Sequence, residues 1–223
     1  MKKIIGIILA VAILLFAEVR NDMRNGTGFF VNSGYIVTAY HVVENFGNIC
    51  YYDIGKDTCY RAHLVDYTVG SDLALLKLDD EPGGIPAVCR IEHSELPIGE
   101  PMMSYGYPDP LVGGGELSAI SLRIRMHYRC DGDTRYYRTN GTIRLGTSGG
   151  PTFTRKGKIG GMNKAIALNE TNTSNIVKST EIVRMLKRNG VSEYPNTKNV
   201  KKCSVSIINS VDEFKSNRQL WSK

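Results

Sequence analysis

The stretch Leu122-Arg123-Ile124-Arg125-Met126-His127-Tyr128-Arg129 alternates between apolar or aromatic residues and basic ones. In an extended chain successive side chains point to opposite faces, so this pattern predicts a strand with one apolar face. The apolar face carries Leu122, Ile124, Met126 and Tyr128. Asp131-Gly132-Asp133 then predicts a turn into a second strand from Thr134 to Thr139.

The opposite face of this predicted hairpin is strongly basic. It carries Arg123, Arg125 and Arg129, with Arg135 and Arg138 across the turn. One interpretation is a solvated sheet face. The other is a surface that attracts acidic substrates or anionic surfaces. Aromatic residues are not interleaved on the basic face as single-strand nucleic-acid binding would require.

Short strand patterns separated by turns continue on both sides of this hairpin. Gly28 to Val31 and Tyr35 to Thr38 flank Asn32-Ser33-Gly34, and residues 48–54 and 58–65 flank Gly55-Lys56-Asp57. Further strands are expected at Leu73–Leu78, Pro101–Tyr105, Ser118–Ser121 and Ser204–Ile208. Helical spacing is clear only at Ser179–Arg188, before Gly190. The pattern predicts an all-β protein with a late helix, and residues 79–84 suit a linker between two lobes.

The first residues have the pattern of an export signal. Met1-Lys2-Lys3 is basic, and the apolar run from Ile4 to Phe16 is shorter than the roughly 17–25 residues of a membrane-spanning helix. We expect cleavage after Ala17, an exported protein that is periplasmic or extracellular, and no membrane span in the mature chain. An uncleaved anchor at the membrane surface is the alternative.

Charge and cysteine content exclude some classes of protein. Without Lys2 and Lys3 the formal net charge falls from +6 to +4, which is modest for a dedicated nucleic-acid binder. Five cysteines suit an oxidising compartment, and their odd number leaves at least one thiol unpaired within the chain. No CxxC pair occurs and the four histidines are dispersed, so no metal site and no cofactor are expected.

Cys50 and Cys59 flank the predicted turn at Gly55-Lys56-Asp57. If the turn centres on Ile54 and Gly55, the two cysteines lie opposite each other and form a disulfide bond. The alternative is that both are small apolar strand residues.

Three short motifs point to nucleophilic catalysis. Gly146-Thr147-Ser148-Gly149-Gly150-Pro151 places a serine between glycines, which permits a tight turn, close approach of substrate and backbone N–H groups facing an oxyanion. His41 directly follows a β-branched strand, and Asp72 precedes the apolar run Leu73–Leu78. Singly, each has an ordinary explanation as a turn, packing or strand-end residue. Together, in the order His, Asp, Ser, they predict a catalytic triad.

With these motifs the chain resembles the trypsin-like (chymotrypsin-fold) serine proteases, and within them the bacterial Deg/HtrA group. The resemblance covers residues 26 to about 190, and its most specific parts are the serine and histidine motifs. Tyr40 departs from the small or amide residue usual before the histidine. Thr147 departs from the aspartate or asparagine usual before the serine. The chain leaves no room for the peptide-binding PDZ domain of Deg proteases.

The resemblance implies two perpendicular β-barrels with the active site between them. His41 and Asp72 would come from the first barrel and Ser148 from the second, with the N–H groups of Gly146 and Ser148 as oxyanion hole. The substrate pocket would lie between the segment before the serine and the strand after it. We assign it to Thr142, Ile143, Asn163 and Ala165, which offer no carboxylate for a basic substrate residue.

The expected organisation follows. A signal peptide occupies residues 1–17 and a protease domain 18–190, with barrels over about 26–82 and 85–178 and a short C-terminal helix over about 179–189. Residues 191–223 form a polar tail. The expected function is a serine endopeptidase acting on polypeptide substrates through an acyl-enzyme. The alternatives are an inactive binding protein on the same fold and an enzyme that cleaves only esters.

Overall fold

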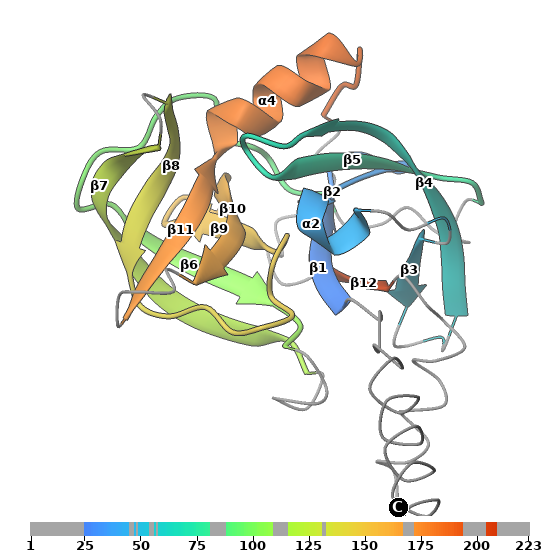
Figure 1. The fold of residues 1–223 in the computed structure, drawn as a ribbon, viewed down its shortest axis with the longest axis horizontal. Helices are drawn as coiled ribbons and strands as arrows, with labels where there is room; N and C mark the ends of the chain where they lie inside the picture. Colours follow the sequence, from blue (N-terminus) through green and yellow to red (C-terminus); the bar gives the residue numbers. More distant parts are fainter. Residues whose placement is uncertain are drawn as a thin grey trace, which may run out of the picture.

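The computed structural model describes residues 25–44, 47, 49–53, 56, 58–80, 88–108, 116–130, 133–166, 172–193 and 204–208. Its strands form two closed barrels of six strands each. Figure 1 shows the barrels side by side, with a helix above them. The predicted all-β fold of two barrels is therefore confirmed. The predicted signal peptide, and most of the linker and tail, lie outside the described residues.

The first barrel has the strand order β1-β12-β3-β4-β5-β2. Its strands are β1 (Asn25–Phe30), β2 (Tyr35–Ala39), β3 (Ile49–Asp53), β4 (Thr58–Thr68), β5 (Leu73–Leu78) and β12 (Ser204–Ile208). The strand predicted at Ser204–Ile208 is present, but it is not part of a separate tail. It pairs antiparallel with both β1 and β3 and completes this barrel. Barrel one thus contains chain from beyond residue 82.

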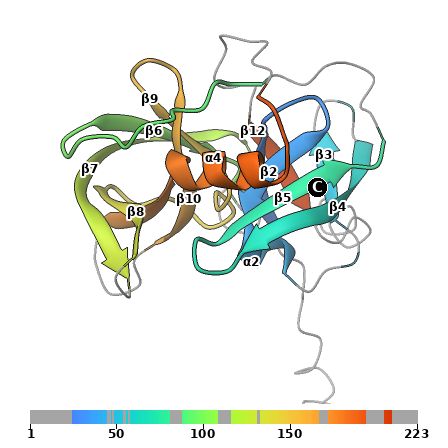
Figure 2. The ribbon, with the colours of Figure 1, turned by 90° about the horizontal axis from the view of Figure 1, so that it is seen from above.

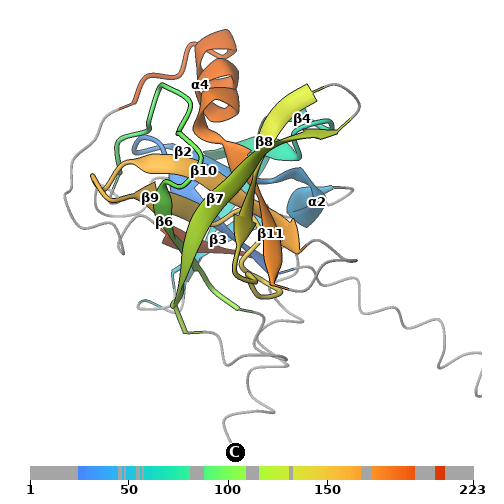
Figure 3. The same cartoon turned by 90° about the vertical axis from the view of Figure 1, so that its left-hand side faces the viewer.

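The second barrel has the order β10-β11-β8-β7-β6-β9. Its strands are β6 (Pro101–Gly106), β7 (Ser118–Cys130), β8 (Asp133–Asn140), β9 (Pro151–Thr154), β10 (Ile159–Ile166) and β11 (Thr173–Lys178). In Figure 3 this barrel faces the viewer, and β7 and β8 form a long hairpin. All six strands come from one continuous stretch of chain.

The alternation that predicted β7 is interrupted in the structure. Leu122 and Ile124 are buried as expected, whereas Met126 is 47% exposed. The register with β8 shifts between Ile124 and Met126, and such a bulge moves the following side chains to the other face. His127 therefore turns toward the barrel, where its ring packs edge-on against Tyr137.

The helix α4 (Ser179–Arg188) joins the barrels. Seen from above in Figure 2, it lies over their junction. Its buried residues are Ser179, Ile182, Val183, Met185 and Leu186, and several of them belong to a core shared by both barrels. At its C-terminal end Arg188 donates to Asp66 and to Thr68 at the end of β4. No helix among the described residues is long and apolar enough to cross a membrane.

Cys50 and Cys59 form a disulfide bond across the β3–β4 hairpin, with their Cα atoms 5.7 Å apart. Cys59 pairs with Tyr52 and Cys50 with Arg61, so the two cysteines are diagonal rather than directly opposite. We expect the double variant Cys50→Ala/Cys59→Ala to lose about 2.7 kcal/mol of unfolding free energy, because a loop of about ten residues is no longer closed in the unfolded chain. Urea unfolding measures this loss, and reduced wild-type protein should match the variant. Equal stability of all three samples would show that the bond contributes nothing.

Lys178, the last residue of β11, is buried, and its ammonium donates to Glu95 at 2.7 Å. This hydrogen bond lowers the pKa of the Glu95 carboxyl below its ordinary value of 4.5. Since the folded pKa is the lower one, the pair stabilises the fold above about pH 4.5 and loses this effect as pH falls through the folded pKa. We expect Glu95→Gln to cost about 1–2 kcal/mol at pH 7, because Glu95 is half exposed. The gap to wild type in urea unfolding should shrink at pH 3.5, and a gap independent of pH would contradict this.

Candidate active site

His41 lies in a helix of one turn, α2 (Tyr40–Val43), which directly follows β2. Asp72 precedes β5 at the end of a turn, and its φ of 54° is in the left-handed region. The carboxylate of Asp72 meets His41 twice: Oδ1 accepts from the backbone N–H at 2.9 Å, and Oδ2 lies 2.7 Å from the ring Nδ1. The backbone N–H of Tyr40 also donates to the Asp72 carbonyl at 3.0 Å. The aspartate thus fixes both the backbone and the ring of the histidine.

Asp72 is more deeply buried than His41, as suits an orienting carboxylate and a reactive imidazole. The Asp72 side chain is 9% exposed, whereas that of His41 is 41% exposed. A carboxylate with little access to water interacts strongly with the donors that it does have. The imidazole is thus the more accessible of the two partners. Asp66 in β4 does not compete for His41, because its carboxylate accepts from Arg188 and Asn189.

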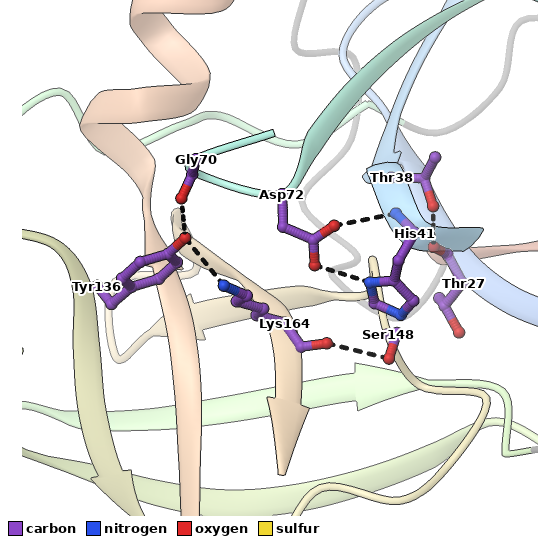
Figure 4. Close-up of polar contacts among 8 residues, drawn as sticks. All are labelled: Thr27, Thr38, His41, Gly70, Asp72, Tyr136, Ser148 and Lys164. Carbon is purple, nitrogen blue, oxygen red and sulfur yellow. Dashed lines mark hydrogen bonds and ion pairs between the residues drawn. The ribbon is translucent and has the colours of Figure 1, made fainter. Parts of the chain in front are cut away.

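Ser148 lies in the loop between β8 and β9 of the second barrel. Its hydroxyl donates to the backbone carbonyl of Lys164 in β10 at 3.1 Å. In Figure 4 the Ser148 side chain lies beside the His41 ring, at the edge opposite the Asp72 carboxylate. The structure therefore brings the three predicted residues from both barrels into one site.

The turn before Ser148 has a left-handed residue at Gly146, a conformation that glycine adopts without strain. The N–H of Thr147 donates to the Arg144 carbonyl at 3.1 Å and closes a four-residue turn with Gly146 in third place. Gly146 has a φ of 84°, as the third residue of a type II turn requires. The Thr147 hydroxyl donates to the same carbonyl at 2.6 Å. Within the described segments the N–H groups of Gly146 and Ser148 donate to no protein acceptor, so both remain available to a ligand.

The side chain of Asn163 in β10 stabilises the loop that carries Ser148. Its side chain has no exposed surface. Oδ1 accepts from the hydroxyls of Ser104 (2.8 Å) and Thr152 (2.7 Å). Nδ2 donates to the carbonyls of Tyr105 (3.2 Å) and Thr147 (3.1 Å). All four hydrogen-bonding positions of the amide are thus used inside the protein.

The predicted substrate pocket needs correction as a result. Asn163 is buried, and Ile143 is 1% exposed and packs in the core of the second barrel, so neither side chain is available to a substrate. Thr142 is exposed. The side chain of Ala165 lies outside the described part of the structure.

Sequence reasoning missed Thr27 of β1, which joins the serine loop to the first barrel. Its hydroxyl donates to the Gly146 carbonyl at 3.0 Å, and its N–H donates to the Ser148 carbonyl at 2.8 Å. Thr27 stands between Gly26 and Gly28, and added Cβ atoms there would lie 2.5 Å from Val42 and 2.8 Å from Ile36. The two glycines were the only local signal of this close packing.

In the segments that the structure describes, no three His, Cys, Asp or Glu side chains are grouped so that they could hold a metal ion.

Two closed barrels with this histidine, aspartate and serine at their junction define the chymotrypsin-like fold. The family described as trypsin-like peptidase domain matches residues 26–162. The chain therefore belongs to the trypsin-like peptidase family.

Relatives and solved structures agree with this membership. A probable periplasmic serine endoprotease, DegP-like, from Chlamydia trachomatis is 31% identical over 66% of this chain and 29% of its own length. Serine protease Rv3671c from Mycobacterium tuberculosis is 27% identical over 75% of this chain and 43% of its own. The active form of the Rv3671c protease superposes with a TM-score of 0.63 at 25% identity, covering 79% of this chain and 78% of that structure. This chain thus spans less than half the length of these curated relatives.

Proposed function

We propose that this protein is a serine endopeptidase that hydrolyses peptide bonds through an acyl-enzyme. The observation that carries the proposal is the double contact of the Asp72 carboxylate with His41, at 2.9 Å and 2.7 Å, beside Ser148. This contact leaves the Nε2 edge of the ring to face the serine. Membership in the trypsin-like peptidase family supports the same activity.

The roles follow the general logic of Ser-His-Asp triads. The Ser148 oxygen attacks the carbonyl carbon of the scissile bond while Nε2 of His41 takes the hydroxyl proton. The C–N bond then breaks, the same proton passes to the leaving amine, and the acyl group stays on Ser148. Water repeats the sequence with His41 again as base, which releases the acid and restores the serine. Asp72 holds the proton on Nδ1 and stabilises the imidazolium formed at each step.

The N–H groups of Gly146 and Ser148, which donate to no acceptor in the described segments, suit the negative charge that develops on the carbonyl oxygen. They belong to one rigid loop, because the N–H of Gly149 donates to the Asn163 carbonyl and the Asn163 side chain donates to the Thr147 carbonyl. Donors that are already oriented need no rearrangement during the reaction. A loss of either donor typically costs about 3 kcal/mol of barrier height.

We further propose that the protein acts after export, in the periplasm or outside the cell. The disulfide bond between Cys50 and Cys59 suits an oxidising compartment. A DegP-like relative is described as periplasmic. Polypeptides are the proposed substrates.

A fluorophosphonate probe tests the proposed function, because it reacts with an activated serine. Wild-type protein should be labelled at one site, and Ser148→Ala should not be labelled. Ser94→Ala is a matched control, since Ser94 is an exposed serine that donates to Glu92. Its labelling should equal that of wild type.

Two outcomes favour the other functions. A folded wild-type protein that resists the probe would indicate a binding protein on this fold. A protein that is labelled and cleaves a nitrophenyl ester, but leaves casein and peptide libraries intact, would indicate an esterase.

A further inference from the structure

The turn that carries Asp72 is an unusual support for a catalytic group. It runs from Val69 to Asp72 and is closed by the Asp72 N–H, which donates to the Val69 carbonyl at 3.1 Å. Asp72 itself has a φ of 54°, a conformation that costs a non-glycine residue about 1 kcal/mol or more. Val69, at the start of the turn, is 68% exposed. Contacts from outside the turn are therefore needed to hold Asp72 in place.

One such contact comes from the second barrel. The hydroxyl of Tyr136 in β8 donates to the carbonyl of Gly70, in the middle of the turn. Tyr136 is 4% exposed, so the donor side of this hydrogen bond has little access to water. The guanidinium of Arg135 also lies against the turn, since a Cβ atom on Gly70 would be 2.4 Å from its Nη1. The turn is thus docked on β8 two residues before Asp72.

Lys164 of β10 completes this contact. Its Nζ lies 3.0 Å from the Tyr136 hydroxyl oxygen and 4.3 Å from the centre of the Tyr136 ring. An ammonium group only donates, so the Tyr136 oxygen accepts from Lys164 and its own proton is directed at Gly70. A charged donor also polarises the hydroxyl and strengthens the bond that it donates. Figure 4 shows this chain of contacts beside the triad.

Lys164 contacts the site at its other end as well. Its backbone carbonyl accepts the Ser148 hydroxyl at 3.1 Å. One residue therefore touches the serine through its main chain and the support of the aspartate through its side chain. The polar path runs from Ser148 through Lys164 and Tyr136 to Gly70, across the junction of the barrels.

We propose that Tyr136 and Lys164 are positioning residues that act through Asp72: from the second barrel they hold the Val69–Asp72 turn so that the Asp72 carboxylate stays in register with His41. The inference rests on the proposed function, because Asp72 matters for the rate only if the triad is catalytic. Neither residue touches the reacting atoms through its side chain. Tyr136 and Lys164 raise the rate by raising the fraction of molecules in which His41 is correctly oriented.

Tyr136→Phe tests the proposal, since it removes the hydroxyl and keeps the ring. We expect kcat on a peptide substrate to fall about tenfold, because the variant loses both the hydrogen bond donated to Gly70 and the one accepted from Lys164. KM should change less than twofold. Lys164→Met, which keeps the side-chain stem, should lower kcat in the same way by about threefold or more. Tyr137→Phe is the matched control, because the adjacent Tyr137 uses its buried hydroxyl to accept from Leu96 within its own barrel. Its kcat should stay within twofold of wild type.

A double-mutant cycle separates positioning from general destabilisation. In an Asp72→Asn background, acylation by a nitrophenyl ester should slow less than twofold when Tyr136→Phe is added. The proposal is overturned if the tenfold loss persists in that background, if the loss lies in KM, or if Tyr137→Phe has the same effect.

Hydrogen exchange gives a readout that does not need activity. The Asp72 amide, which donates to Val69, should exchange about tenfold faster in Tyr136→Phe than in wild type or Tyr137→Phe. Unchanged exchange would overturn the positioning role. A wild-type protein that neither reacts with the probe nor cleaves peptides would instead overturn the proposed function.

Discussion

Replacement of Asp72 by asparagine is expected to lower kcat about 10,000-fold without unfolding the protein, the loss typical of this exchange in Ser-His-Asp triads. The reason is the hydrogen bond between Oδ2 and Nδ1 of His41, which is 2.7 Å long. An amide that keeps its oxygen on the His41 backbone N–H turns its NH₂ group toward the ring. Nδ1 must then accept, so the ring proton moves to Nε2, which can no longer take the proton of Ser148.

Steady-state cleavage of a peptide measures this loss, and circular dichroism with a melting curve reports the fold. Asp66→Asn is the matched control, because Asp66 is a nearby aspartate of the same barrel that binds Arg188 and Asn189. We expect its kcat within about threefold of wild type, as for a change outside the reacting groups. A larger loss from Asp66→Asn than from Asp72→Asn would show that the orienting carboxylate has been misassigned.

The second large effect is expected for Gly149→Ala. Gly149 has a φ of 85°, and an added Cβ atom would lie 2.1 Å from the Thr27 carbonyl and 2.4 Å from the Thr38 hydroxyl oxygen. Thr38 donates to the Thr27 carbonyl at 2.7 Å, so neither atom can move away cheaply. We expect a loss of about 3–5 kcal/mol in unfolding free energy, from overpacking together with backbone strain. Urea unfolding measures it, and the probe should label the surviving folded protein slowly.

Gly99→Ala separates the two causes. Gly99 has a φ of 90°, yet a Cβ atom there meets nothing within 4 Å. This variant should therefore show the strain alone, about 1–2 kcal/mol. If Gly149→Ala costs no more than Gly99→Ala, the close packing between the serine loop and β1 is not what makes Gly149 necessary.

The sequence alone was sufficient to predict the features that depend on residues close together in the chain. His41, Asp72 and Ser148 each lie next to a strand or a glycine turn that marks them, and the two-barrel fold follows from many short alternating runs. The substrate pocket depends on which way side chains point, and this was not predictable. The register of β10 shifts between Asn163 and Ala165. Such a bulge decides which of these residues faces the interior, and nothing in the local pattern reveals it.

The sequence pattern also could not predict contacts between residues that are far apart in the chain. Ser204–Ile208 was predicted as a strand, but its pairing with Asn25–Phe29 joins residues nearly 180 positions apart. The contact of Tyr136 with Gly70 likewise joins two barrels, and an isolated tyrosine in a strand carries no sign of it.

The place of β12 in the first barrel determines the order in which the two barrels can close during synthesis. The second barrel can close once residue 178 has left the ribosome. The first barrel lacks its strand β12 until residues 204–208 have also emerged. Until then β1 and β3 have no partner between them and present open edges, which invite pairing with other chains. His41 and Asp72 belong to the late barrel and Ser148 to the early one. A growing chain would therefore place its nucleophile in a closed barrel before the residues that activate it, and proteolysis would begin only after residues 204–208 have emerged.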